Sequence, residues 1–513
     1  MNSRTRSANS IRNLLVGLIS QIVIILLMFV SRTFFIKILG AEYLGLQGLY
    51  TNILTVLSLA ELGIGNVMIY VLYKPVAEKD EGKIRAILKF FKTVYHRIAF
   101  AILLIGIAVI PFLNSIVNSE IPFREVIILY LLFLFNSFIS YFVIYKSALI
   151  NADQKIYLEN IIQTSVIVLR EVGQIIVLIV TQSFLLYLVI MITGTLLNNL
   201  LISKTTDKLY PFLKLSGETS VVETKTIINN IKAIFFYKIG TVLMNHTDNI
   251  LISVLLGTIF VGYYSNYNLL IMAVTTLVSV IIQGVSSSIG NLNASGNIKR
   301  SYELFNSLLL FFHWLSALCA VSFFLVFNDF IKLWIGDEYI LSTIVVSAIV
   351  LNFYIQNIIN PVWVYRETMG LFNRVKYLML IAAVANILLS IFLGLLWGLA
   401  GIILATGLAR ILTTVWYEPM LLYRLKFSKP VKFYWMKQAK YFLLTAITFV
   451  VSLYLTQNFP LSLSFVFFKI FIGITVLSVV FYLANFKSDE YLLLKSFIKI
   501  NVTKKILEAA NKL

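Results

Sequence analysis

The sequence predicts an all-α polytopic membrane protein with about fourteen transmembrane helices, arranged as two six-helix bundles in pseudo-two-fold relation plus two C-terminal helices. Three observations lead to this prediction. The 513 residues are 59% hydrophobic and 13% charged, with a mean hydropathy of +0.91. Apolar segments long enough to cross a bilayer recur along the chain, and a short motif of the first half returns in the second.

Each predicted span is a run of roughly 20 mostly apolar residues, the length that a helix needs to cross the hydrocarbon core. The spans lie near residues 13–38, 46–73, 98–117, 126–149, 160–180, 184–202, 233–255, 261–288, 305–327, 342–363, 377–396, 399–422, 441–456 and 464–483. The basic N-terminus is not followed by a small-residue cleavage site. It therefore reads as the start of a retained first helix and not as a signal peptide.

The distribution of basic residues predicts the orientation. Of the 42 Lys and Arg residues, three precede the first span and 32 lie in alternate connections and the C-terminal tail. The intervening connections hold only Lys37, Arg124 and Lys332. Because basic connections stay on the cytoplasmic side, both termini are expected in the cytoplasm. The net charge of +19 is then explained by topology and by contact with anionic lipid headgroups, and no nucleic-acid partner is expected.

A duplication indicates two related halves. Leu39-Gly40, Leu44-Gly45 and Tyr50 recur, at one constant offset along the chain, as Leu256-Gly257, Val261-Gly262 and Tyr267. Asn13 and Asn230 hold the same offset at the entrance to each copy. Two related membrane-spanning halves are typical of transporters, whose access pathway is built where the repeats meet.

The predicted domains follow from the spans and the duplication. They are an N-terminal bundle (1–205), a cytoplasmic linker (206–224), a C-terminal bundle (225–425), the thirteenth and fourteenth helices (426–484) and a basic amphipathic cytoplasmic tail (485–513).

Motifs of enzymes and of metal or cofactor sites are not found in the sequence. There are no convincing paired carboxylates and no HExxH, GxSxG or phosphate-binding GxxxxGK[ST] motif. The single cysteine, Cys319, excludes an intrachain disulfide and suggests no metal cluster. We therefore expect neither an enzyme nor a cofactor.

Charged residues within the spans are the main candidates for function. A charge near the bilayer centre costs about 2.5–3.5 kcal/mol on insertion scales, so it normally faces a partner or a wet cavity. The cationic candidates for binding an anionic substrate are Arg32, Arg170 and Arg410. The candidates for ion coupling or gating are Glu61, Glu171, His246 and Asp248. A structural role competes with function at each position: snorkelling towards the outer surface for Arg32, a satisfied structural histidine for His246, a bond along its own helix for Asp248, and a partner on another helix for the others.

Three of these predictions concern neighbours in the sequence. Adjacent residues diverge around a helix, so Arg170 and Glu171 are not expected to satisfy each other. Arg410 and Glu418 are roughly two turns apart, too far for an easy direct pair. Asp248 lies three residues after Asn245, so the two can bond along one helix face.

Aromatic and amide side chains of the eighth span suggest sugar contacts. Tyr263, Tyr267 and Asn266 could stack on and hydrogen-bond to sugar rings. An aromatic belt at the membrane interface explains the tyrosines nearly as well.

The order of several apolar motifs resembles one family. These motifs are Phe35-Ile36-Lys37-Ile38-Leu39-Gly40, Leu59-Ala60-Glu61-Leu62-Gly63-Ile64-Gly65, Thr247-Asp248-Asn249-Ile250-Leu251-Ile252-Ser253, Leu333-Trp334-Ile335-Gly336 and Gly398-Leu399-Ala400-Gly401. Over most of its length the chain is similar to the Wzx-type flippases of the multidrug/oligosaccharidyl-lipid/polysaccharide exporter superfamily.

The resemblance implies a bacterial cytoplasmic-membrane protein with two six-helix bundles around a central cavity. It implies that undecaprenyl-diphosphate-linked oligosaccharide is flipped for cell-surface polysaccharide biosynthesis, by alternating access coupled to an ion or voltage gradient. Cationic cavity residues would hold the diphosphate, and the partners would include membrane lipids, a coupling proton or sodium ion, and polysaccharide polymerase and assembly proteins.

Two rival functions remain open at this point. An efflux transporter of the same fold would favour unpaired cavity acids such as Glu61 and Asp248. A polymerase or ligase of lipid-linked sugars would depend on an extracytoplasmic residue such as Asp337 or Glu338.

Overall fold

The protein is built from helices, as the sequence predicts. The computed structural model describes residues 3–61, 64–214, 235, 237–294 and 296–496, and within them there is no β-strand. Twelve helices of this described part are long and apolar enough to cross a membrane. Two of the twelve, residues 15–57 and 378–427, contain a non-helical glycine, Gly40 or Gly398, at which two crossing segments meet. Counting the segments on either side of these junctions gives fourteen, but the predicted span 46–73 is divided among the end of α1 (Ser3–Leu57), η1 (Ser58–Glu61) and α2 (Ile64–Glu78).

The first half of the chain contains the helices up to residue 214. They are α1 (Ser3–Leu57), η1 (Ser58–Glu61), α2 (Ile64–Glu78), α3 (Glu81–Val109), η2 (Ile110–Phe112), α4 (Leu113–Ile116), α5 (Phe123–Ser140), α6 (Ile144–Ala152), α7 (Ile156–Thr181), α8 (Phe184–Leu209) and η3 (Pro211–Lys214).

The second half begins with helical residues before His246. It continues with α10 (Asp248–Leu256), α11 (Thr258–Ala294), α12 (Ile298–Trp334), η4 (Asp337–Tyr339), α13 (Thr343–Ile358), α14 (Asn360–Thr368), α15 (Phe372–Val375), α16 (Leu378–Arg410), the π-helical η5 (Ile411–Val415), α17 (Trp416–Leu422), the π-helical η6 (Tyr423–Phe427), α18 (Lys432–Thr456) and α19 (Leu463–Asn485).

The structure corrects several predicted boundaries. The polar stretch between Lys74 and Arg97 is mostly helical, because α2 and α3 extend beyond the apolar residues. The predicted span 126–149 is two helices, α5 and α6, separated at residues 141–143. Of the predicted linker (206–224) and tail (485–513), residues 215–224 and 497–513 lie outside the described residues.

The duplication is visible in the backbone. The backbone turns with a positive φ angle at Gly40 and Gly257, and again at Lys79 and Gly296. Both pairs are separated by the same number of residues as the two copies of the repeated motif. Two further pairs, Gln154 with Gly370 and Gln182 with Gly398, share an offset that is shorter by one. Because these turns end corresponding helices, they align the two halves residue by residue from α1 to the start of α8 and from α10 into α16.

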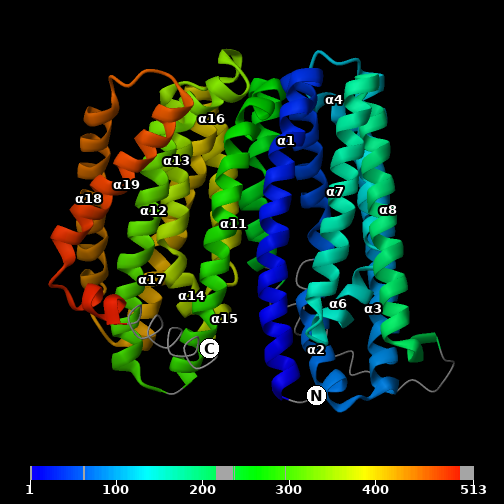
Figure 1. The fold of residues 1–513 in the computed structure, drawn as a ribbon, viewed down its shortest axis with the longest axis horizontal. Coiled ribbons are helices and arrows are strands. Elements are labelled where there is room, and N and C mark those ends of the chain that lie inside the picture. Colours follow the sequence, from blue (N-terminus) through cyan, green and yellow to red (C-terminus); the bar gives the residue numbers. More distant parts are fainter. Residues whose placement is uncertain (1–2, 62–63, 215–234, 236, 295, 497–513) are drawn as a thin grey trace, which may run out of the picture. The chain divides into compact units, whose positions relative to one another are not determined.

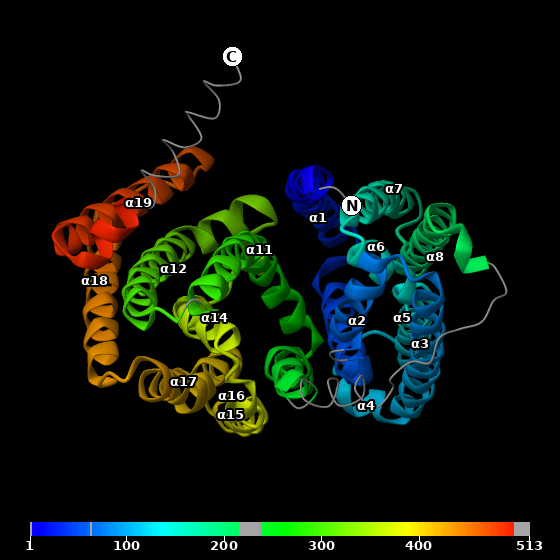
Figure 2. The same cartoon turned by 90° about the horizontal axis from the view of Figure 1, so that it is seen from below.

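By packing, the chain forms two compact units, Met1–Ser265 and Asn266–Leu513. The boundary falls inside α11 and differs from the predicted domain limits, which stay a prediction. In the first unit α7 packs against α1 and α8, and α6 is enclosed by α2, α3, α7 and α8 (Figures 1 and 2). In the second unit α12 packs against α13, α18 and α19.

The last two helices are tied to the second unit by polar contacts. The Lys469 ammonium of α19 donates to Asp329 of α12. His313, fully buried in α12, bonds to Gln438 of α18 at 2.7 Å and to Tyr354 of α13 at 3.0 Å. The two C-terminal helices are therefore an integral part of this unit.

Candidate functional site

Two predicted arginines of the first unit lie beside one carboxylate. Arg32 is on α1, Arg170 and Glu171 are on α7, and Tyr187 is near the start of α8. Arg32 is close enough to interact electrostatically with both Glu171 and Tyr187. We call these four residues the arginine cluster.

The prediction that Arg170 and Glu171 do not satisfy each other is wrong. The Arg170 guanidinium donates from Nη2 to Glu171 Oε1 at 2.7 Å. The arginine side chain is long enough to turn back across the helix surface and reach the carboxylate of the next residue. Glu171 is nearly buried, whereas the Arg170 side chain is 29% exposed, so the pair lies at the edge of the bundle interior.

The arginine cluster has more positive than negative charge. Arg32 Nη1 and Arg170 Nε are buried and have no hydrogen-bond partner among the described residues. Glu171 is the cluster's only acidic group, facing two guanidinium groups. A buried donor without a partner is costly, so these N–H groups are available to an anionic acceptor.

A glycine gives Arg170 its position. A Cβ added to Gly194 of α8 would lie 3.0 Å from Arg170 Cδ and 3.1 Å from its Cγ. The absent side chain lets the aliphatic part of Arg170 lie directly against α8. Gln174, one turn further along α7, donates to the Tyr187 carbonyl at 3.1 Å and ties the two helices together.

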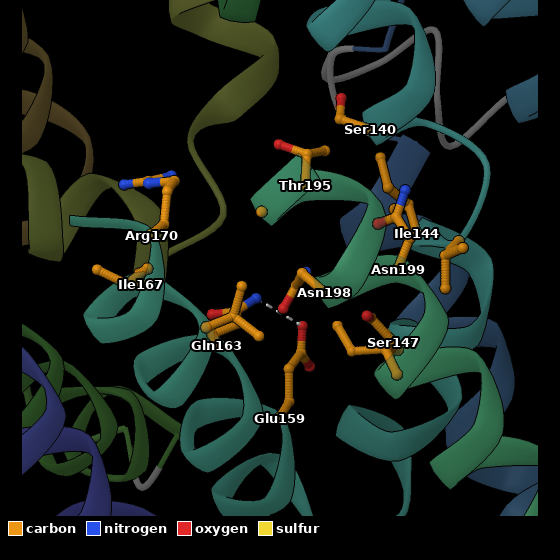
Figure 3. A pocket seen from close by; sticks show the side chains of 14 residues that line it. Ser140, Ile144, Ser147, Glu159, Gln163, Ile167, Arg170, Thr195, Asn198 and Asn199 are labelled. Carbon is orange, nitrogen blue, oxygen red and sulfur yellow. Dashed lines mark hydrogen bonds between the residues drawn. The ribbon is translucent and has the colours of Figure 1, made fainter. Parts of the chain in front are cut away.

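A pocket of about 370 Å³ extends from Arg170 into the first unit. Figure 3 shows its polar side chains, from Ser140 and Thr195 at the top to Glu159 at the bottom, with Gln163 and Asn198 between them. Gln163 donates to Glu159 at 3.3 Å, and Asn198 Oδ1 is buried with no partner among the described residues. The polar part of the lining consists of amides, hydroxyls, one carboxylate and one guanidinium, and the rest is aliphatic, from Val143, Ile144, Val166, Ile167 and Ile202.

Sequence reasoning missed the lower part of this pocket. Glu159, Gln163, Arg170 and Gln174 are separated by four, seven and four residues, the spacing of one helix face. This periodicity was readable in the sequence. Glu159 and Gln163 lie near the polar end of the predicted span. Polar residues at such a position are ordinarily explained by a helix end that is exposed to water.

The third predicted arginine belongs to the second unit. Arg410 is 4% exposed and donates from Nη1 to Gln356 of α13 at 2.9 Å. Glu418 does not pair with Arg410, as expected. Its partner is Arg366 of α14, whose Nη1 lies 2.9 Å and 3.0 Å from the two carboxylate oxygens, and both side chains are buried.

The predicted coupling residues occupy different surroundings. Glu61 ends η1 and accepts a hydrogen bond from the Tyr141 hydroxyl. His246 Nδ1 lies 2.8 Å from Asn52 Oδ1 of α1, which agrees with a structural histidine. Asp248 begins α10 and is 7% exposed. Of these residues only Glu171 lies in the arginine cluster.

The predicted sugar contacts differ from one another. Tyr267 is fully buried; its hydroxyl donates to Asn328 Oδ1 at 2.7 Å and accepts from the Leu341 amide at 2.9 Å. Tyr267 therefore anchors a connection in this structure. Tyr263 is partly buried and lies edge-on to Phe260. Asn266 is fully buried, and neither of its amide atoms has a partner among the described residues.

Within the part of the chain that the structure describes, no group of three His, Cys, Asp or Glu side chains is arranged to hold a metal ion.

Comparison with known proteins completes the description. No protein-family model matches the sequence, and no curated protein matches it. Among solved structures, the chain is similar to the lipid II flippase MurJ in an inward closed conformation. The TM-score is 0.64 at 15% identity, over 91% of this chain and 97% of that one.

Two multidrug transporter structures are similar as well. An inward-facing MATE family transporter of the MOP superfamily has a TM-score of 0.63 at 13% identity, over 79% of this chain and 95% of that one. The MATE transporter DinF-BH in complex with R6G has a TM-score of 0.58 at 14% identity, over 83% and 97% of the two chains. The protein is thus a multi-pass α-helical membrane protein. Its fold is the one that these flippase and MATE structures share.

Proposed function

We propose that the protein is a flippase that moves undecaprenyl-diphosphate-linked oligosaccharide from the inner to the outer leaflet of the bacterial cytoplasmic membrane by alternating access. The oligosaccharide would serve the assembly of a capsule, an exopolysaccharide or an O-antigen-like glycan. The similarity to a lipid II flippase supports a lipid-linked cargo, and the similarity to MATE structures supports a transporter fold.

The observation that carries the proposal is the charge of the arginine cluster. Glu171 is paired with Arg170 and interacts electrostatically with Arg32, all within candidate membrane spans, and Arg32 Nη1 and Arg170 Nε have no partners among the described residues. A diphosphate carries several acceptor oxygens, and guanidinium groups bind such oxygens through paired, charge-assisted hydrogen bonds. The cluster would therefore stabilise the part of the cargo that cannot cross hydrocarbon unaided.

Coupling to a gradient needs a group whose occupancy differs between two states. A bound ion biases alternating access only through its differential affinity for the two conformations. We retain Glu61, Glu171, His246 and Asp248 as the residues to test. Glu171 has the clearest physical rationale, because its carboxylate is paired with Arg170 beside the proposed diphosphate site.

The efflux alternative gains no support from the arginine cluster. A carrier of small cations needs an unmatched negative charge, whereas Glu171 is paired with Arg170 and faces Arg32 as well. A polymerase or ligase would lose activity on substitution of Asp337 or Glu338, and a flippase would not.

Gene deletion in the native bacterium tests the proposal. The lipid-linked oligosaccharides of each leaflet are measured by mass spectrometry, in parallel with surface polysaccharide. We expect unpolymerised repeat units to accumulate on the inner leaflet while surface glycan is lost. Unchanged lipid-linked pools and intact surface glycan, in a strain without a second exporter, would contradict the flippase and favour efflux.

A further inference from the structure

The residues that line the pocket beside Arg170 differ from their counterparts in the second half of the chain. The left-handed turns at Gln154 and Gly370, and at Gln182 and Gly398, align α7 with the first half of α16 at one offset. The nine-residue helices α6 and α14 hold the same offset. The duplicated fold therefore provides an internal comparison for each residue that lines the pocket.

Small residues open the upper part of the pocket. Gly194 corresponds to Arg410, and Ser140 lies at the end of α5 as Gln356 lies near the end of α13. In the second half these two long side chains are joined by a hydrogen bond of 2.9 Å, which occupies the equivalent space. The first half has a glycine and a serine there, and the pocket opens between them.

Polar residues line the lower part of the pocket. Glu159 and Gln163 correspond to Val375 and Met379, both of which are buried, and Ser147 corresponds to Trp363. The same fold thus packs apolar side chains in one half and presents a carboxylate, an amide and a hydroxyl in the other. Burying a polar atom without a partner is costly, so the buried Asn198 Oδ1, beside Glu159 and Gln163 in this pocket, indicates an occupant that can donate hydrogen bonds.

We propose that this pocket binds the sugar that is attached directly to the diphosphate of the cargo. This inference rests on the proposed function, because the arginine cluster holds the diphosphate and Arg170 forms the shared wall of both sites. Amides and hydroxyls donate to and accept from sugar hydroxyl groups, and Asn198 Oδ1 is a buried acceptor with no other partner among the described residues.

The single carboxylate of the pocket defines the class of sugar. Glu159 accepts hydrogen bonds from hydroxyl groups but repels a second carboxylate in the same pocket. Because Arg170, the guanidinium of this pocket, is already paired with Glu171, the pocket favours a neutral hexose or N-acetylhexosamine over a uronic acid in this first position.

The test measures binding of lipid probes to the full-length protein in lipid nanodiscs. The probes are undecaprenyl diphosphate and its N-acetylglucosamine and glucuronic acid derivatives. For the wild type we expect N-acetylglucosamine to tighten binding about tenfold over the bare diphosphate lipid, and glucuronic acid to give no gain.

Two near-isosteric variants probe the amides, and one probes the charge. The variants are Gln163→Met, which introduces the residue found at the equivalent Met379, and Asn198→Leu. Each should reduce the affinity gain from N-acetylglucosamine about fivefold. Each should leave the affinity for undecaprenyl diphosphate within twofold of wild type. Glu159→Gln should raise the affinity for the glucuronic acid lipid about tenfold. Thr193→Val, on the exposed face of α8, is the matched control and should change neither value.

The outcomes separate the two proposals. If the wild type does not bind undecaprenyl diphosphate, the proposed function fails and this inference fails with it. If the wild type binds undecaprenyl diphosphate but the sugar adds no affinity, only the sugar pocket is refuted. The same holds if Gln163→Met and Asn198→Leu keep the full wild-type gain from N-acetylglucosamine. A parallel loss of affinity for both lipids in these variants also refutes it, because the residues would then act through the structure of the diphosphate site.

Discussion

Arg32 and Arg170 come from helices that are well separated in sequence, α1 and α7, and meet beside Glu171. Each residue was a candidate because a charge within an apolar segment is costly. Their proximity to one carboxylate depends on how α1 packs against α7, which hydropathy does not encode. The same holds for Glu418, which bonds to Arg366 of α14 and not to Arg410, although Arg410 is nearer to it in the sequence.

Substitution of Arg32 tests the proposed anion site. Arg32→Gln removes a guanidinium group whose Nη1 has no partner among the described residues, so we expect undecaprenyl diphosphate to bind about 10–100-fold more weakly, the effect of one charge-assisted hydrogen bond. Binding is measured in lipid nanodiscs. Lys37→Gln removes an exposed charge from the same helix and should change affinity less than twofold. Equal effects of the two substitutions would show that only net charge matters.

Asn266 offers a test of stability at the residue scale. Its side chain is fully buried without hydrogen-bond partners among the described residues, whereas the corresponding residue of the first half is the fully buried Leu49. Asn266→Leu should raise the free energy of unfolding by about 1–2 kcal/mol, because it removes an unsatisfied amide. The change is read from the unfolding temperature of the purified protein.

The control for Asn266 is an equally buried but satisfied amide. Asn386 Oδ1 accepts from Thr406 at 3.1 Å and from Ser390 at 3.3 Å, so Asn386→Leu should lower the unfolding temperature. If Asn266→Leu stabilises the protein yet abolishes export, the predicted sugar contact gains support. A loss of stability in Asn266→Leu would show that the amide is satisfied in solution.

At the scale of the helices, hydropathy predicts the segments that cross the membrane and fails where helices continue beyond it. The stretch between Lys74 and Arg97 is helical because Asp80 caps the start of α3 by accepting from the Lys83 amide at 2.8 Å. Polar residues are compatible with a helix in water, so a polar stretch does not distinguish a loop from a helical extension. The break between α5 and α6 contains no proline or glycine, so the sequence gives no signal that predicts it.

The attachment of α19 can be tested with a pair of substitutions. Lys469→Met leaves Asp329 of α12 without its ammonium partner and should cost about 1–3 kcal/mol of stability. Lys469→Met with Asp329→Leu replaces both charges and should recover most of the loss. Unfolding temperatures are compared with that of Lys432→Met, an exposed lysine of α18. Additive losses in the double variant would show that the two side chains act independently.

At the scale of the whole molecule, the duplicated motif explains a contact between its two copies. A Cβ on Gly45 would collide with the carbonyl of Thr258, and a Cβ on Gly262 would collide with the carbonyl of Ala41. Ala41 and Thr258 are themselves equivalent positions of the duplication, so each copy of the motif supplies one glycine and one carbonyl to the other. The first glycines, Gly40 and Gly257, are left-handed and place the following helices for this approach.

This reciprocal contact predicts the effect of single methyl groups. Gly45→Ala and Gly262→Ala should each lower stability by about 1–3 kcal/mol, since the colliding atoms belong to backbone and cannot rotate away. Gly17→Ala is the control, because its Cβ would lie 3.6 Å from Asn160 Nδ2, an ordinary contact. Thermal unfolding of the purified variants checks the result. If Gly45→Ala behaves like Gly17→Ala, the two helices are further apart in the membrane than in this structure.

Apolar runs of spanning length, basic alternate connections and the repeated Leu-Gly motif are local features, so a multi-pass helical membrane protein could be predicted from them one segment at a time. Only the tertiary structure decided which polar residues meet. Arg32 with Glu171 and Arg410 with Gln356 are brought together by helix packing, which depends on small residues such as Gly194 and on side-chain reach rather than on hydropathy. The two halves share one fold but differ in these contacts, and the pocket beside Arg170 arises from that difference.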